Sequence, residues 1–158
     1  MKIIILVPSP FCELSNIGMI SNFPIDYMHL ICLGVMRKLL NLWIKGPLHV
    51  RIGTQAIRVL SNASIACRCR DQVPCEFARK PRQISELDRW KATELRQFLL
   101  YTGPVCLQHV LNEAMYCNFM LQSVGMYILL SPKLSAQYCS FAGDLLKLFV
   151  ENAGKLYG

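Results

Sequence analysis

Charged residues are scarce in this sequence. Only 17% of its 158 residues are charged, whereas an average globular chain contains about 25%. Hydrophobic residues make up 53%, and a length of 158 residues corresponds to about one domain. The sequence therefore predicts a single domain whose core is unusually apolar, or whose surface is partly covered by something outside this chain.

Paired cysteines are also missing. The chain has eight cysteines, but no two of them stand in the Cys-x-x-Cys spacing that zinc sites usually use. Cys67, Cys69 and Cys75 lie close together without a plausible fourth ligand, so we expect no zinc site and assign these residues no role. Such scattered cysteines in a chain of this length do not indicate a disulfide framework. We therefore expect a reducing compartment, nuclear or cytoplasmic, and no secretion.

No hydrophobic run is long enough to direct the chain to a membrane. The apolar stretch Ile3–Val7 has five residues, fewer than the ~7–15 of a signal peptide, and is typical of a short buried strand or an unusual start. Residues 114–132 carry no charge, but Asn118, Gln122 and Ser123 interrupt them. Because a membrane span needs ~20 predominantly apolar residues, a buried core helix is favoured, and we expect no membrane partner.

Helical periodicity is the main positive signal. Asp26 is a candidate N-cap for a first helix that Gly46-Pro47 would end, and Ser85-Glu86-Leu87-Asp88 resembles a capping box. No alternating strand of useful length follows residue 8. The predicted fold class is therefore mainly α, a bundle-like arrangement of about five to six helices. The expected helices span residues 27–44, 54–60, 86–101, 105–112, 114–130 and 134–153.

Two stretches interrupt the helical pattern. Residues 8–24 contain several Pro and Gly residues, so we expect a loop-rich N-terminus. Residues 63–83 cluster Cys and Arg and contain Pro74 and Pro81, which predicts a long basic connection. Long connections in compact domains are often functional.

Positive charge is concentrated in the middle of the chain. Residues 37–82 hold ten Lys/Arg against two Asp/Glu, although the whole chain carries only +7. This bias suits a polyanion such as nucleic acid, and a solvated basic surface is the alternative. The candidate nucleic-acid-binding residues are Arg79, Lys80, Arg82, Arg89 and Lys91.

Other residues in this basic region leave two questions open. Four acids are interleaved with the cations, so a surface laced with salt bridges is an equally valid interpretation. These acids are Glu76, Glu86, Asp88 and Glu94. Trp90 is favoured as a core anchor, and base stacking is its alternative role.

Asp26 and His29 form the most distinctive pair. They are separated by three positions at the head of an otherwise apolar helix, so their side chains share one face. Such a pair can belong to a metal or phosphate site. Alternatively, Asp26 caps the helix and His29 is a hydrogen-bonded packing residue.

Several stretches resemble a known family. They include Phe23-Pro24-Ile25-Asp26-Tyr27-Met28-His29, the run from Arg89 to Gly103 (RWKATELRQFLLYTG), and Ile128-Leu129-Leu130-Ser131-Pro132. Together they are similar to transposase-like proteins of animal DNA transposons related to the CACTA type. The resemblance covers about residues 14–158, which we expect to form a single helical domain, and leaves residues 1–13 as an unmatched N-terminal segment.

The resemblance implies a ribonuclease H-like transposase core, which uses three carboxylates and two divalent metal ions to cut and rejoin DNA. In several such families a motif of Asp or Cys, two residues and His lies near the second catalytic Asp, and Asp26-Tyr27-Met28-His29 matches it. The resemblance therefore implies that Asp26 is a catalytic and Mg²⁺-binding residue. It also implies that His29 contacts a phosphate or orients a ligand.

The remaining carboxylates of such a site cannot be assigned. Glu13 is the only acid before Asp26, and the downstream candidates Glu113 and Glu151 are not distinguished by any motif. We therefore expect a truncated fragment without catalytic activity by itself, which needs Mg²⁺ only if catalytic chemistry survives.

Two hypotheses about function follow. The first is a transposase-derived fragment that associates with DNA through its basic middle. The alternative is a helical protein-interaction or structural module with no nucleic-acid role. Its partner would be a missing flanking domain or another protein chain.

Overall fold

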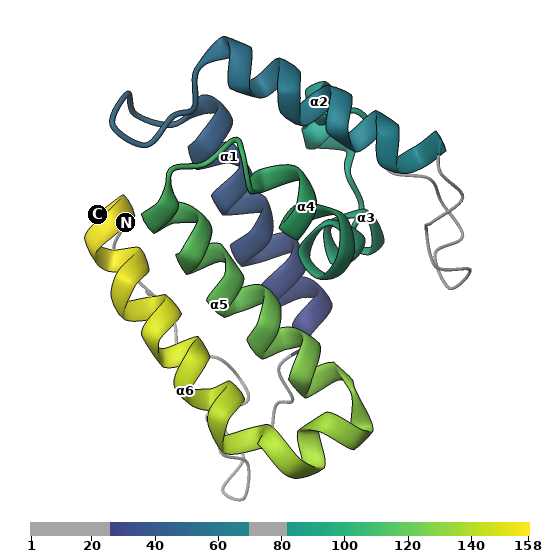
Figure 1. The fold of residues 1–158 in the computed structure, drawn as a ribbon, viewed down its shortest axis with the longest axis vertical. Helices are drawn as coiled ribbons and strands as arrows, with labels where there is room; N and C mark the ends of the chain where they lie inside the picture. The colour runs from purple at the N-terminus through teal and green to yellow at the C-terminus, as the bar shows by residue number, and fades with distance from the viewer. Residues whose placement is uncertain (1–25, 70–81) are drawn as a thin grey trace, which may run out of the picture.

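The prediction of a mainly α fold is confirmed. The structure is a computed structural model that describes residues 26–69 and 82–158, with the side chains of 65–69 left out. Within these ranges six α-helices are joined by short 3₁₀ and π segments, and no strand occurs (Figure 1). The expected strand at residues 3–7, the loop-rich N-terminus and most of the basic connection lie outside the described residues.

The first helix agrees closely with the predicted span of residues 27–44. A π-helical segment, η2 (Met28–Met36), continues directly into α1 (Arg37–Lys45). The helix stops at Gly46, where a Cβ atom would lie 2.3 Å from the backbone oxygen of Leu42. A close backbone approach of this kind accepts only glycine, so the predicted stop signal is confirmed.

The second helix is longer than predicted. α2 spans Thr54–Cys69, whereas the sequence pattern predicted a helix only over residues 54–60. Neither Gly nor Pro occurs between Thr54 and Pro74, so nothing in the backbone chemistry ends the helix earlier. The predicted connection near 63–83 is therefore wrong for residues 63–69, and residues 70–81 lie outside the described part.

The predicted helix over residues 86–101 is broken in two. A 3₁₀ helix, η3 (Ile84–Arg89), is followed by two extended residues with ψ angles of 132° and 165°, Trp90 and Lys91. α3 (Ala92–Gln97) begins directly after them. The break turns the Trp90 indole into the core, where its Nε1–H donates to the backbone oxygen of Gln83 at 3.1 Å.

The predicted capping box at Ser85 and Asp88 is also wrong. Each oxygen of the Asp88 carboxylate instead accepts a hydrogen bond from Lys45 Nζ, at 2.9 Å. The box-like contact lies six residues later, where Glu94 accepts from the backbone N–H of Lys91 at 2.9 Å. The cap therefore belongs to the second of the two shorter helices.

A π turn carries the chain through the predicted break at Thr102-Gly103-Pro104. α3 continues through η4 (Phe98–Thr102) into α4 (Gly103–Leu107), and the Gly103 N–H donates to Phe98 O, five residues earlier. The wider turn accommodates Pro104, which has no N–H of its own to donate. α4 ends at Leu107, so the helix expected over 105–112 is shorter than predicted.

The last two helices form an antiparallel pair. α5 (Glu113–Leu130) and α6 (Pro132–Tyr157) lie side by side and meet at Ser131 (Figure 1). Both agree with the predicted spans 114–130 and 134–153. Among the described residues, no helix combines the length and apolarity needed to cross a membrane.

The core lies where the first helix, α3 to α4 and α5 meet. Trp43 packs edge-on against Phe119 with ring centroids 6.1 Å apart, and Trp90 packs against Phe98 at 5.7 Å. The polar residues of the uncharged stretch in α5 turn inward, and Ser123 donates to the backbone oxygen of Leu99 at 2.7 Å. The expected buried core helix is therefore present, with its polar side chains on the buried face.

Candidate functional sites: an acid–imidazole pair and a cationic depression

Asp26 caps the first helix. Its backbone oxygen accepts from the N–H of Leu30 at 2.9 Å, and its Oδ1 accepts from the N–H of Met28 at 2.8 Å. This is the N-cap arrangement, in which a side-chain oxygen satisfies one of the free N–H groups of the first turn. The predicted capping role is therefore present in the structure.

His29 pairs with the other oxygen of the same carboxylate. Its Nδ1 lies 2.5 Å from Asp26 Oδ2, and the His29 and Asp26 side chains are 77% and 54% exposed. The hydrogen bond from His29, followed by that from Met28, lowers the pKa of Asp26 below its ordinary value. The spacing of three residues thus brings the two side chains together, as the sequence predicts.

The residues around this pair do not fit a two-metal centre. Both oxygens of Asp26 already accept hydrogen bonds within the first helical turn. In the described ranges, no three His, Cys, Asp or Glu side chains are close enough to share a metal ion. Glu113 lies in the first turn of α5 and Glu151 near the end of α6, and neither joins Asp26. A Mg²⁺ pair needs several carboxylate oxygens, so no chemical step can be derived from Asp26 and His29.

Cys32 lies one turn further along this helix and is fully buried. Burial raises the pKa of its thiol to about 11, with Arg96 opposing and Asp26 adding to the shift. A thiol with this pKa is almost entirely protonated at neutral pH and is a poor nucleophile and metal ligand. Cys32 therefore behaves as a small core residue.

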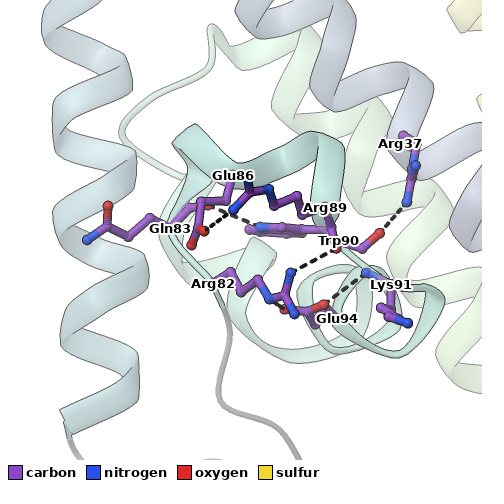
Figure 2. A network of polar contacts seen from close by, with 8 residues as sticks. All are labelled: Arg37, Arg82, Gln83, Glu86, Arg89, Trp90, Lys91 and Glu94. Carbon is purple, nitrogen blue, oxygen red and sulfur yellow. Dashed lines mark hydrogen bonds and ion pairs between the residues drawn. The ribbon is translucent and has the colours of Figure 1, made fainter.

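Most of the described basic candidates lie around Trp90, as Figure 2 shows. Arg82 is tied to the chain itself: its Nε lies 3.4 Å from Glu94 Oε1, and its Nη1 donates to the backbone oxygen of Arg89 at 3.2 Å. Glu94 is only 2% exposed. Arg82 therefore supplies the counter-charge of a buried carboxylate. Arg79 and Lys80 lie outside the described residues.

Trp90 is a core residue. Its indole N–H is bound to the backbone oxygen of Gln83 (Figure 2). Its side chain is 1% exposed, and its ring packs on Phe98. A base can stack only on an exposed aromatic face. The favoured interpretation as a core anchor is therefore confirmed, and base stacking on Trp90 is excluded.

The interleaved acids pair with nearby cations. Asp88 binds Lys45, Glu94 faces Arg82, and Glu86 Oε1 lies 3.7 Å from Arg89 Nη1. The last of these pairs is long and exposed, so it contributes little and opens readily. The alternative of a salt-bridged surface therefore applies to the part of the basic region that contains Glu86, Asp88 and Glu94. Glu76 lies outside the described residues.

A shallow depression gathers the cations that remain. Its lining combines Arg37 from α1 and Arg89 from the end of η3 with Trp90 and Lys91 from the extended break before α3, as well as Leu33, Ala92 and Thr93. Arg37 donates from Nη2 to the backbone oxygen of Trp90, as Figure 2 shows. Arg37 lies 53 positions before Trp90 and was not among the predicted nucleic-acid-binding residues. In the sequence, Arg37 differed from its neighbours by being a cation, next to Lys38, on an otherwise apolar helix.

A second concave surface is apolar. A groove of about 680 Å³ runs between the first helix and the C-terminal half of α6. Leu30, Gly34 and Leu42 line one wall, Phe149, Val150 and Gly154 line the other, and Lys38 is the cation among the lining residues. Val150 is 65% exposed. Large apolar side chains are thus left uncovered along this groove.

Comparison with known proteins identified no relative of this chain. No family model, curated protein or solved structure matches this chain.

Proposed function

We propose that this chain is a transposase-derived helical module that associates with DNA through its basic middle and does not cut DNA by itself. The resemblance of the Asp26–His29 motif and of the segment from Arg89 to Gly103 supports the transposase origin. The isolated position of the Asp26–His29 pair supports the absence of catalysis, since no further carboxylate or imidazole among the described residues joins it.

The observation that carries DNA association is the basic middle of the chain, and the cationic depression is the part of it that the structure describes. Arg37 is anchored by a backbone carbonyl, which leaves its charge uncompensated, and Lys91 makes no ion pair with another described residue. Within the described ranges, the one ion pair of Arg89 is its long contact to Glu86. A basic surface of this kind attracts phosphate groups by releasing their counterions.

A salt titration with a short fluorescent duplex tests this function. We expect binding that weakens steeply as salt increases, because each neutralised phosphate releases a counterion. The double variant Arg79→Ala/Lys80→Ala should weaken binding, whereas Lys133→Ala, on an exposed lysine of α6, serves as the matched control. Arg82 is left unchanged, because its loss would uncover the buried Glu94 carboxylate and disturb the fold.

Catalysis is tested in the same preparation. We expect no cleavage of the duplex with Mg²⁺ present, and no change on Asp26→Asn. Cleavage that requires Mg²⁺ and disappears in Asp26→Asn would contradict the proposal.

The second candidate function is a helical protein-interaction module without a nucleic-acid role. The apolar groove between the first helix and α6 supports it, because an amphipathic helix of another protein chain, a second copy being the simplest case, can pack its apolar side there. Salt separates the two functions. Phosphate binding weakens with added sulfate, whereas apolar association strengthens. Light scattering of wild-type and Val150→Glu protein across sulfate concentrations would detect self-association through the groove.

A further inference from the structure

We propose that the depression lined by Arg37, Arg89 and Lys91 is a seat for one phosphate group of a nucleic-acid backbone, and that it reads neither the bases nor the number of strands. The inference rests on the proposed DNA association and adds its contact point, its chemistry and a residue, Arg37. Arg37 from α1, Arg89 from the end of η3 and Lys91 from the extended break before α3 all line it.

Arg37 provides the fixed charge of the seat. Its half-buried guanidinium donates to the Trp90 carbonyl, a neutral acceptor, so the side chain is held in place and its positive charge is not paired with a carboxylate among the described residues. A carboxylate partner would have neutralised that charge. Holding a cation in position before the ligand arrives removes part of the entropy cost of binding.

Arg89 and Lys91 provide adjustable charges at the rim. Arg89 is 77% exposed and lies 3.7 Å from a Glu86 oxygen, a contact that costs little to release. Lys91 is exposed, and its backbone is held by the Glu94 carboxylate at the start of α3. Both side chains can therefore turn toward a phosphate oxygen without disturbing the fold.

The lining also lacks an exposed ring on which a base could stack. The single aromatic residue in it is Trp90, whose ring is buried and whose N–H and carbonyl oxygen already bind Gln83 and Arg37. Apart from the three cations, the other lining residues are aliphatic or carry one hydroxyl, Thr93. Single-strand binding proteins need exposed rings for stacking, and sequence readers need groups that reach base edges. Arg and Lys side chains bind phosphates in any sequence and can also bind guanine edges, so the comparison of two unrelated sequences below tests whether bases are read.

Fluorescence anisotropy across salt concentrations, with a labelled duplex and its labelled single strand in two unrelated sequences, tests the seat. The variants are Lys91→Ala, Arg89→Ala/Lys91→Ala and Arg37→Gln, and Lys133→Ala and Lys155→Ala are the matched controls on α6. The glutamine amide of Arg37→Gln can still donate toward the Trp90 carbonyl, and circular dichroism confirms that each variant is folded.

We expect each variant of the depression to weaken binding by roughly five- to tenfold on both forms of DNA and on both sequences. The slope of log affinity against log salt measures the number of phosphates that the protein neutralises. Because the three cations share one phosphate, the slope should fall by about one in the double variant as well as in the single variants. The controls should match the wild type.

Four results would overturn the seat. First, the depression variants could bind like the controls while Arg79→Ala/Lys80→Ala weakens binding. That result would contradict this inference and leave the proposed function standing. A slope that falls by about two in the double variant would mean separate phosphates. A strong preference for the single strand, or for one sequence, would mean that bases are read. Equal displacement of the DNA by poly-glutamate and by inorganic polyphosphate would assign the depression to an acidic protein segment.

Discussion

Asp26 combines two roles, one for each oxygen of its carboxylate. One oxygen caps the first helix and the other binds His29, so each carboxylate oxygen accepts a hydrogen bond although the side chain is exposed. Each of these bonds favours the charged form of Asp26. At the scale of single residues, hydrogen bonding therefore lowers the pKa of this carboxyl group, and burial raises the pKa of the Cys32 thiol six residues later.

The Asp26 carboxyl should titrate below its ordinary pKa of 3.8, because its largest stabilising contact is the hydrogen bond to His29. The contribution of this group to stability is present above its unfolded pKa and is lost as pH falls through the lower folded pKa. An NMR titration of the carboxyl carbon measures the shift. His29→Ala should return the pKa toward 3.8. An unchanged pKa in His29→Ala would show that the pair does not form in solution.

Cys32 should resist alkylation in the folded protein. Its pKa of about 11 leaves little thiolate at mildly alkaline pH, and its side chain has no exposed surface. Cys117 and Cys139 are exposed and serve as internal controls. Iodoacetamide labelling followed by peptide mass spectrometry should modify the two controls first and Cys32 only after unfolding. Equal labelling of Cys32 and Cys139 in folded protein would contradict its burial.

Among the helices, the segment from α3 to α4 shows how closely packing restricts the backbone. Its π turn places Gly103 against the core, where an added Cβ would lie 2.5 Å from Phe98 O and 2.9 Å from Phe119 Cζ. Gly143 is also helical but has open space in front of it. The same residue type is thus required at one position and dispensable at the other.

Gly103→Ala should destabilise the protein by about 1–3 kcal/mol, because the methyl group overpacks the junction with α5. Gly143→Ala is the matched control and should stabilise it by about 0.5–1 kcal/mol, since alanine is the better helix former. Urea unfolding followed by circular dichroism gives both values. A neutral Gly103→Ala would mean that α4 and α5 lie further apart than the structure places them.

For the molecule as a whole, one contact joins the C-terminal end of α6 to the first helix. Trp43 Nε1 donates to the Tyr157 hydroxyl at 3.3 Å, across 114 positions of sequence. Burial raises the pKa of Tyr157, and the contacts with Trp43 and Asn118 oppose this shift. Tyr157 also lines the apolar groove, so this contact helps to define the groove's shape.

Tyr157→Phe should lower the free energy of unfolding by about 1 kcal/mol, because it leaves the Trp43 N–H without its acceptor. The exposed Tyr127→Phe is the matched control. In the wild type, the contribution of Tyr157 to stability should be present below pH 10.0, the ordinary pKa, and decline as pH rises toward the higher folded pKa. Urea unfolding at neutral and alkaline pH tests both statements. Equal effects of the two variants would contradict the contact.

Much of this fold follows from local chemistry that the sequence displays. The Asp26 cap, the stop at Gly46 and the spans of α5 and α6 depend on residues a few positions apart, so their patterns were sufficient to predict them. The pairing of Asp26 with His29 is local in the same way. The mainly α class rests on the sum of such signals.

The break at Trp90 could not be predicted from neighbouring residues. A helical pattern continues through this position, and only the core offers the indole a buried place and a partner at Gln83. The tertiary structure also decided which cations remain available. In the folded chain Arg82 pairs with the buried Glu94 carboxylate, and Arg37 lies in the depression although it belongs to another helix. Charge pairing depends on distance in space and not on distance along the chain.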